Sequence, residues 1–245
     1  MDALLIVDEP ASGAWNMAVD EALLRWASES GKTVLRFYQW SEPTLSLGYF
    51  QRYGDRHAHR SSATIPAVRR TTGGGAIVHD QELTYSFVTP IRDRFHNSLQ
   101  TLVSRFHESL IACLRNRGIL ADLIRHTSLP DGEEAFLCFQ RRSKSDVVID
   151  RQKIAGSAQR RHRGALLQHG SVLWATSTAA PELPGISDLK ATSFAQSDLM
   201  QSWLEHLAAE LDVQFIDSEL PAPQRAWALD FEQNRFASRT WTQKR

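Results

Sequence analysis

A glycine triplet that follows two arginines is the first segment that could do chemistry. It reads RRTTGGGA, and Gly73, Gly74 and Gly75 come just after Arg69 and Arg70. Consecutive glycines let a backbone approach a ligand closely and adopt positive φ angles, although they cost conformational entropy on folding. Guanidinium groups offer planar sets of donors to a carboxylate or a phosphate. The segment predicts a loop against a ligand, and a flexible surface turn is the alternative.

The same segment does not match the common nucleotide-binding loops. It is neither GxGxxG nor the phosphate loop that ends in Gly-Lys-Ser/Thr. Both of those loops lead into a helix, whereas residues 76–79 are expected to form a strand. No nucleotide loop of either kind is therefore predicted.

A lysine followed by three small residues is the second candidate. Lys153 begins the run KIAGSAQ, in which Gly156, Ser157 and Ala158 stand where a strand usually carries larger side chains. Small side chains inside a sheet indicate that something else fills the space. A lysine beside such a gap could hold a carbonyl or carboxylate oxygen. The alternative is an ordinary solvent-facing lysine at the end of a strand.

The third candidate is one of the two cysteines. Cys138 lies in the polar run FLCFQRRSKSD, whereas Cys113 lies on the apolar face of an expected helix. The reactive form of cysteine is the thiolate, and neighbouring cations favour it. The candidate cations are Arg141, Arg142, Lys144 and Lys153. Cys138 could therefore be a nucleophile or a buried structural residue, and Cys113 fits the structural role.

Histidines and overall charge exclude some classes of function. His79 and His169 each follow a run of strand-like residues, but neither has the spacing of a metal site, and no metal is predicted. Acidic and basic residues balance at 28 each, which argues against non-specific binding of nucleic acid. Local basic clusters at 69–70, 141–144 and 160–163 suit an acidic carrier protein or a phosphate-bearing substrate.

The whole chain reads as a single domain over residues 1–245. With 42% hydrophobic residues it can build a sizeable core, and no Pro/Gly/Ser linker divides it. Two cysteines do not make a disulfide framework. The N-terminal run lacks the basic start of a signal peptide, and no apolar run approaches the ~18 residues of a membrane span. A soluble, cytoplasmic protein is expected.

Periodicity predicts the elements that position these residues. Strands are expected at 3–7, 33–40, 44–51, 76–79, 83–88, 146–149, 153–159 and 165–173, with a turn at Asp80-Gln81. Helices are expected at 15–28, from Asn97 or Ser98 to Gly118, across Leu199 to Leu211, and after Pro221. Because strands cluster in hairpin-like groups, we expect an α+β fold with a mostly antiparallel or mixed sheet, flanked by helices on one face.

Four ordered motifs together resemble one known family. The sequence is similar to lipoate–protein ligase A and the octanoyltransferases, whose catalytic domain is related to that of biotin–protein ligase. The motifs are NMAVDEALL (16–24), LRFYQWSEPTLSLGYFQ (35–51), RRTTGGGAIVHDQELTYSFV (69–88) and KIAGSAQRRHRGALLQHGSVL (153–173). The resemblance covers most of the chain. A biotin ligase itself would be expected to carry a Gly-Arg-Gly-Arg loop, which is absent.

The resemblance implies a fold, a site and a set of roles. It implies one catalytic domain without a separate C-terminal accessory domain, and an acyl chain under the glycine-rich loop. Lys153 would be the catalytic lysine at the acyl carbonyl. Burying an eight-carbon chain would contribute up to roughly 5 kcal/mol, at about 0.8 per methylene. The substrate-binding residues would be Arg70, Gly73, Gly74, Gly75, His79, Gly156, Ser157 and Ala158.

Two activities compete within this family. An octanoyltransferase moves octanoate from acyl carrier protein, through a cysteine thioester and without a cofactor, to the lysine of a lipoyl domain or of the glycine-cleavage H protein. A ligase activates free lipoate with ATP and magnesium. The Cys-Phe pair at Cys138 resembles the transferase subgroup, in which it would be the nucleophile, with Lys153 favouring the thiolate and orienting the carbonyl. A non-enzymatic paralogue that binds acyl groups or lipoyl domains is the remaining alternative.

Two segments depart from the family pattern. Arg141 and Arg142 are larger and more charged than the residues expected after the Cys-Phe pair. The turn at 150–152 also lacks the glycine expected before the lysine motif. The arginines follow the predicted nucleophile and the turn precedes the lysine motif, so both departures bear on the role expected of Cys138.

Overall fold

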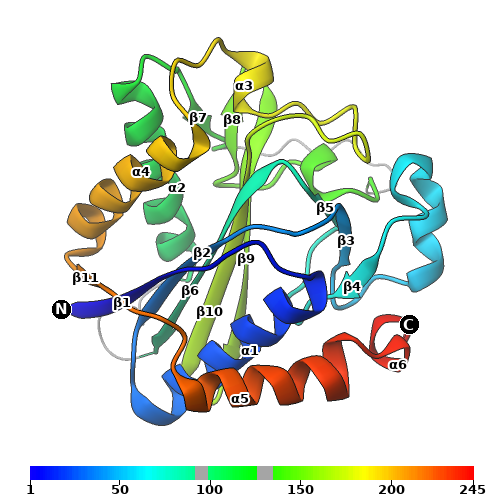
Figure 1. The fold of residues 1–245 in the computed structure, drawn as a ribbon. Helices are drawn as coiled ribbons and strands as arrows, with labels where there is room; N and C mark the ends of the chain where they lie inside the picture. Colours follow the sequence, from blue (N-terminus) through cyan, green and yellow to red (C-terminus); the bar gives the residue numbers. More distant parts are fainter. Residues whose placement is uncertain (92–98, 126–134) are drawn as a thin grey trace.

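The computed structural model describes residues 1–91, 99–125 and 135–245, and a mixed sheet of eight strands forms its centre (Figure 1). The strand order is β11-β1-β2-β6-β10-β9-β8-β7. β1 pairs in parallel with β2 and with β11, and the other neighbours are antiparallel. The strands are β1 (Asp2–Val7), β2 (Val34–Tyr38), β6 (Glu82–Pro90), β7 (Asp122–Leu123), β8 (Val147–Ile149), β9 (Gln152–His162), β10 (Ala165–Leu173) and β11 (Gln214–Asp217).

A second sheet of three strands carries the glycine-rich loop. Its order is β4 (Ala67–Arg69), β3 (Thr44–Leu47) and β5 (Ile77–His79). The predicted strands on either side of Asp80-Gln81 both form, but they do not pair with each other. β5 pairs with β3 in the small sheet, and β6 pairs with β2 and β10 in the large one. A turn signal reports a change of direction and not which strands pair, so the hairpin expected here is wrong.

The helices cover both faces of the large sheet. They are α1 (Gly13–Ser30), α2 (Leu99–Asn116), α3 (Ile186–Leu189), α4 (Gln196–Leu211), α5 (Ala222–Phe231) and α6 (Arg239–Thr242), with a π-helical turn at Glu232–Phe236. Short 3₁₀ turns occupy Tyr53–Ala58, Arg60–Ser62 and Cys138–Gln140. α1 and α5 lie on one side of the sheet, and α2 and α4 lie on the other (Figure 1). The expectation of helices on one face is therefore wrong.

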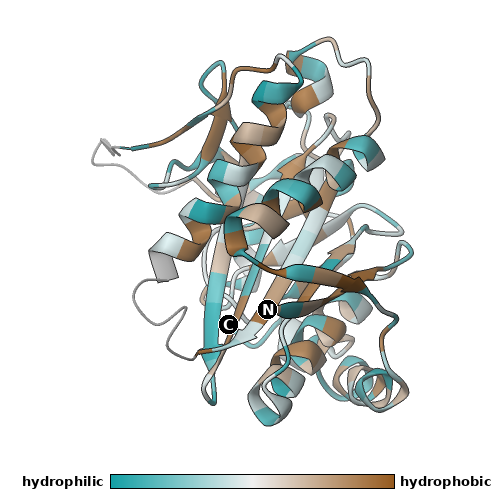
Figure 2. Cartoon of the chain, turned by 90° about the vertical axis from the view of Figure 1, so that its left-hand side faces the viewer, coloured by the Kyte–Doolittle hydropathy of each residue, from teal (hydrophilic) through white to brown (hydrophobic). Residues whose placement is uncertain are grey.

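Adjacent residues of one strand show why two faces are covered. Phe87 packs with Leu110 and Trp203 beneath α2 and α4, whereas its neighbour Val88 packs with Leu23 beneath α1. Side chains alternate between the two faces of a strand, and every residue of β6 from Glu82 to Thr89 is buried. Each face therefore needs its own layer of helices. Figure 2 shows hydrophobic (brown) and hydrophilic (teal) residues on both the strands and the helices.

Two tight turns shape the region that carries Lys153. Asp150 and Arg151 join β8 to β9 with φ angles of 47° and 67°, and Arg163 and Gly164 join β9 to β10 with 44° and 77°. Two-residue loops with positive φ at both positions match the natural twist of a hairpin. The turn before the lysine motif therefore closes without the expected glycine, although two residues with side chains adopt left-handed backbone there.

The predicted helix ends agree in part with the structure where it describes them. Gly118 follows α2 with a φ of 78°, as predicted, whereas α1 extends beyond the predicted 15–28 and ends at Gly31 with a φ of 72°. The predicted caps Asn97 and Ser98 lie outside the described residues. Cys113 is buried on the inner face of α2, as the structural reading predicted. No helix among the described residues is long and apolar enough to cross a membrane.

Candidate active site

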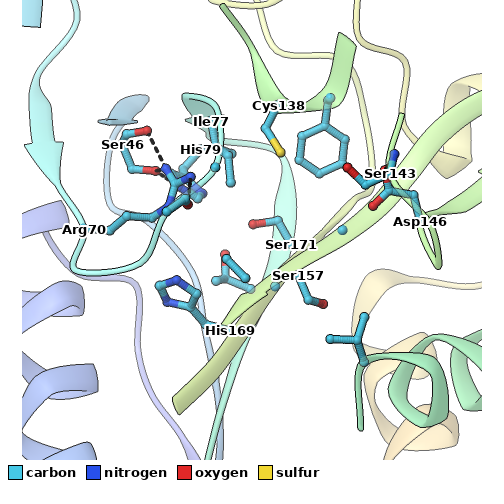
Figure 3. A pocket seen from close by; sticks show the side chains of 18 of the residues that line it. Ser46, Arg70, Ile77, His79, Cys138, Ser143, Asp146, Ser157, His169 and Ser171 are labelled. Carbon is cyan, nitrogen blue, oxygen red and sulfur yellow. Dashed lines mark hydrogen bonds between the residues drawn. The ribbon is translucent and has the colours of Figure 1, made fainter. Parts of the chain in front are cut away.

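A cavity of about 230 Å³ is lined by residues of both sheets (Figure 3). Of the ten predicted site residues, Gly75 alone does not line it. The nine that do are Arg70, Gly73, Gly74, His79, Cys138, Lys153, Gly156, Ser157 and Ala158. The apolar part of the lining comes from Met17, Ile77, Val103, Phe139 and Ala158. The fold thus brings the glycine-rich loop, the cysteine and the lysine motif to one place.

The predicted nucleophile and the predicted catalytic lysine are in contact. Nζ of Lys153 lies 3.7 Å from Sγ of Cys138 and donates to the Cys138 carbonyl oxygen at 3.2 Å. In Figure 3 the sulfur points into the cavity. Leu137, one residue before the cysteine, is buried in the core of the small sheet. The amide of Cys138 also donates to the carbonyl of Ala76 at 2.7 Å, which fixes the cysteine beside the end of the glycine-rich loop.

Asp146 is a site residue that the sequence did not reveal. Its Oδ2 lies 2.8 Å from Nζ of Lys153 and also accepts from the amide of Ser143 at 2.7 Å. Burial raises the pKa of Asp146, although the positive charge of Lys153 opposes the shift. One signal could have found it: Asp146 begins the strand predicted at 146–149, on the other arm of the hairpin from Lys153 and two residues before Val148, which pairs with the lysine.

The small residue Gly156 makes room for the lysine itself. A Cβ added to Gly156 would lie 2.8 Å from Cε of Lys153 and 3.3 Å from Oδ1 of Asp146. The lysine side chain therefore bends over this glycine to reach both Asp146 and Cys138. The gap that the sequence assigned to a ligand is partly filled by Lys153.

Arg70 holds the glycine-rich loop together. Its guanidinium donates to the carbonyl oxygens of Ser46, Gly73 and Gly75 at 2.9, 2.8 and 2.6 Å. Burial lowers the pKa of Arg70 to about 10, so the side chain stays charged at neutral pH. Arg69 is also buried and donates to the carbonyls of Gly48, Gln51 and Thr242. Arg70 thus braces the glycine-rich loop and Arg69 the neighbouring segment at 48–51, so the alternative of a flexible turn with incidental arginines is wrong.

Two of the three glycines are required by geometry. Gly74 adopts a φ of 92°, a backbone conformation that residues other than glycine rarely adopt. A Cβ on Gly75 would lie 2.9 Å from Nε of Arg141 and 3.0 Å from the amide nitrogen of Cys138. A Cβ on Gly73 would meet only the ring of Phe50, at 3.8 Å. Gly75 therefore permits the close approach of the loop to the cysteine segment, although it does not line the cavity.

The histidines of the cavity are each paired with a buried carboxylate. His79 lies 2.5 Å from Glu82 through Nδ1 and 2.7 Å from the Ser46 hydroxyl through Nε2. Burial lowers the pKa of His79, although Glu82 opposes the shift. His169 contacts Asp20 at 3.0 Å through Nδ1. No group of three His, Cys, Asp or Glu side chains that could hold a metal ion is found among the described residues.

Asp20 and Glu82 were not predicted from the sequence as part of the site. Burial opposes ionisation of Asp20, but the hydrogen bond from His169 and the charge of Arg36 outweigh it and lower its pKa. Arg36 donates to Asp20 at 3.1 Å, and the Tyr38 hydroxyl donates to it at the same distance. Asp20 lies in α1 and Glu82 in β6. Both elements were predicted from the spacing of their apolar residues, and that spacing does not show that an acid among them is buried.

The two arginines that depart from the family pattern tie down the cysteine segment. Arg141 donates through Nε to the carbonyl of Ala135 at 2.6 Å. Arg142 donates to the carbonyl of Arg151 at 2.8 Å, in the turn between β8 and β9. Both side chains therefore link the residues around Cys138 to neighbouring backbone, and the contact between Cys138 and Lys153 forms with them in place.

Comparison with known proteins identifies the family. Residues 12–203 match the lipoyl protein ligase A/B catalytic domain. The chain is 31% identical to octanoyltransferase LipM of Carboxydothermus hydrogenoformans, with 94% of each chain covered. It is 30% identical to octanoyltransferase LipM of Brevibacillus brevis, with 98% of each covered. The chain belongs to the lipoyl protein ligase A/B family. The predicted family is thereby confirmed, and with it the class of enzyme, octanoyltransferase or lipoate–protein ligase.

Solved structures of the lipoyl protein ligase family share the fold. A lipoate-protein ligase A bound with ATP superimposes with a TM-score of 0.80 at 21% identity, covering 99% of both chains. The bi-partite lipoate protein ligase of Thermoplasma acidophilum gives 0.79 at 21%, covering 99% of this chain and 96% of that one. The predicted α+β fold, with a mixed sheet between helices, is confirmed. The catalytic and binding roles of the individual residues stay predictions.

Proposed function

We propose that this chain transfers an octanoyl group, or a lipoyl group, from acyl carrier protein to a protein lysine through a thioester on Cys138. The acceptor would be a lipoyl domain or the glycine-cleavage H protein. One observation carries the proposal: Sγ of Cys138 and Nζ of Lys153 lie 3.7 Å apart at the edge of a partly apolar cavity. The names of the two relatives above, both octanoyltransferases, support it.

In the first step the cysteine takes the acyl group. The thiolate of Cys138 attacks the thioester carbonyl of the acylated carrier, forming a new carbon–sulfur bond. The bond to the carrier's sulfur breaks, and that sulfur leaves as a thiolate that takes a proton from water. Lys153 has three N–H donors, of which one meets Asp146 and one meets the Cys138 carbonyl. The third points toward the sulfur, where it can stabilise the developing oxyanion.

In the second step the acceptor lysine takes the acyl group from the enzyme. Its neutral amine attacks the carbonyl carbon of the thioester, a carbon–nitrogen bond forms, and the bond to Sγ of Cys138 breaks. The proton that the nitrogen loses is taken up by the departing sulfur, and loss of that proton to solvent returns the cysteine to the thiolate. Neither step needs ATP, magnesium or another cofactor, because the energy of the thioester drives formation of the amide.

The cavity suits the acyl chain in size and lining. Met17, Ile77, Val103 and Phe139 present apolar surface beside the reacting sulfur. Burial of a hydrocarbon chain gains about 0.8 kcal/mol per methylene. The braced glycine-rich loop holds its part of the wall in place, so this gain is not spent on ordering the loop.

The test follows the acyl group by mass. The full chain is incubated with octanoyl carrier protein, without ATP, and then with an apo lipoyl domain. We expect the enzyme to gain one octanoyl group and to pass it to the lipoyl domain. Cys138→Ser is expected to form no thioester and to lose at least about a hundred-fold in transfer. Cys113→Ser, which changes the buried cysteine of α2, is the matched control and is expected to keep both steps.

Other outcomes would decide against the thioester route. If no transfer occurs without ATP, but free lipoate is transferred with ATP and magnesium, the chain is the ligase of this family. If Cys138→Ser transfers octanoate as fast as the parent chain, the cysteine is not the nucleophile. Retained activity of Lys153→Ala would show that the lysine is wrongly assigned.

A further inference from the structure

The hydrogen-bond partners of the Ser157 hydroxyl allow only one placement of its proton. It lies 2.7 Å from Nε2 of His107, a buried residue of α2. Nδ1 of His107 faces the backbone carbonyl of Ser145, which can only accept, so Nδ1 carries the ring proton. Burial lowers the pKa of His107 to about 4, so the ring is neutral at neutral pH. Nε2 is then an acceptor, and the proton of Ser157 points at it.

A second contact of Ser157 fixes one of its lone pairs. The Tyr85 hydroxyl lies 2.7 Å from Oγ of Ser157, and it must donate because the serine proton is already used. Tyr85 in turn accepts from Nε2 of Gln168 at 3.0 Å, and Oε1 of Gln168 accepts from Gln159 at 2.7 Å. The donor and acceptor assignments are consistent along this series of hydrogen bonds. A serine oxygen has two lone pairs, so Ser157 keeps one.

The remaining lone pair of Ser157 belongs to an oxygen in the wall of the cavity. Ser157 lines the cavity, and in Figure 3 it lies across from Cys138, on the side of α2. On the neighbouring strand, a Cβ added to Gly170 would lie 2.6 Å from Oγ of Ser157 and 2.7 Å from Cε1 of Tyr85. Because Gly170 has no Cβ, the Ser157 hydroxyl can occupy this position. Toward a substrate, Ser157 offers an acceptor and no donor.

The two reacting groups of the proposed transfer need opposite partners. The thioester carbonyl accepts hydrogen bonds, and Lys153 supplies donors beside Cys138. The amine of the incoming lysine donates hydrogen bonds and needs an acceptor. We propose that Oγ of Ser157 accepts a hydrogen bond from that amine and turns its lone pair toward the thioester carbonyl, an inference that rests on the proposed octanoyltransferase function.

Ser157 would act by holding the nucleophile rather than by taking its proton. The hydrogen bond leaves the proton on the nitrogen until the carbon–sulfur bond breaks, when the sulfur of Cys138 takes it. His107 keeps Ser157 in its acceptor orientation and is a positioning residue. Because an amine held in line reacts far faster than one that tumbles, the second step depends on Ser157 and the first does not.

The two steps can be measured separately. Octanoyl-enzyme is prepared from the full chain and from Ser157→Ala, then mixed in a single turnover with apo lipoyl domain. We expect Ser157→Ala to acylate Cys138 at the parent's rate and to transfer roughly ten- to a hundred-fold more slowly. Ser157→Thr, which restores a hydroxyl, is expected to recover most of the transfer rate. Concentrated hydroxylamine, a small nucleophile that needs no positioning, should discharge both octanoyl-enzymes equally fast.

A matched control removes another buried serine hydroxyl. Ser109 of α2 accepts from the Trp203 indole at 2.9 Å and does not line the cavity, so Ser109→Ala is expected to keep both rates within about twofold. Transfer by Ser157→Ala at the parent's rate would overturn the inference, as would an equal loss in acylation and in hydroxylamine discharge. If the parent chain itself forms no octanoyl-enzyme, the proposed function fails, which is a different result from failure of one variant.

Discussion

Lys153 and Asp146 form an ion pair of 2.8 Å in which the lysine side chain is 2% exposed and the aspartate side chain 7%. Removing one partner of a buried pair leaves the other charge without compensation. The pair also fixes where the ammonium group lies, because Nζ reaches Cys138 from the same position. Asp146 is therefore expected to position the lysine that serves the cysteine.

Asp146→Asn tests this positioning. Asparagine keeps the shape and can still accept from the amide of Ser143, but it has no charge to hold the ammonium group. We expect the rate at which Cys138 is acylated to fall roughly tenfold or more, measured by mass over time. Asp150→Asn, which alters a more exposed pair with Lys190, is the control and should change that rate by less than about twofold. A parental rate in Asp146→Asn would contradict the role.

Two glycines of the glycine-rich loop, Gly75 and Gly73, are predicted to respond differently to replacement by alanine. Gly75→Ala places a Cβ 2.9 Å from Nε of Arg141 and 3.0 Å from the amide nitrogen of Cys138, so the cysteine segment must shift. We expect acylation of Cys138 to fall about tenfold or more, because small displacements of reacting groups are costly. Gly73→Ala meets only the Phe50 ring at 3.8 Å and is expected to stay within a few-fold of the parent. Equal effects of the two changes would argue against this packing.

Arg70→Lys tests the bracing of the loop. The guanidinium reaches carbonyl oxygens of Ser46, Gly73 and Gly75 together, and an ammonium group cannot match that planar fork. At least one buried carbonyl would lose its partner, at a cost of about 1–3 kcal/mol in the free energy of unfolding. Chemical denaturation measures this loss. Arg142→Lys, which changes an arginine bound to the exposed turn residue Arg151, should cost less than about 1 kcal/mol.

The buried His107 predicts how stability depends on pH. Burial lowers its pKa from 6.5 to about 4. Between these pH values His107 is protonated in the unfolded chain but neutral in the folded chain. The free energy of unfolding therefore falls as pH drops from 6.5 to 4. The full effect is roughly 3 kcal/mol for this one group. His79, whose pKa is also lowered by burial, acts in the same direction.

Denaturation curves across this pH range provide the check. His107→Gln is expected to lose stability less steeply than the parent chain as pH falls, whatever its stability at neutral pH. Ser109→Ala is the control, because it removes a buried hydroxyl without removing a titrating group, and its slope should match that of the parent. A parental slope in His107→Gln would show that His107 does not titrate as its burial requires.

Sequence reasoning identified cavity-lining residues because their types are unusual for their elements. Gly156 in a strand and three consecutive glycines after two arginines are signals that ordinary packing does not produce. Cys138 was found by its charged neighbours, and the structure brings it to Lys153. Asp146, Glu82 and His107 were missed, because a single acid or histidine beside an apolar run looks the same whether it faces solvent or a cavity.

The amino-acid sequence by itself determined the family, the longer strands and helices, and most of the predicted residues that line the cavity, because these depend on local pattern and on side-chain chemistry. Tertiary structure alone decided that β5 leaves β6 for another sheet, that helices cover both faces, and that Lys153 bends over Gly156 to meet Asp146. Strand pairing, layer packing and buried ion pairs join residues far apart in the chain, and no local periodicity records which distant residue will be the partner.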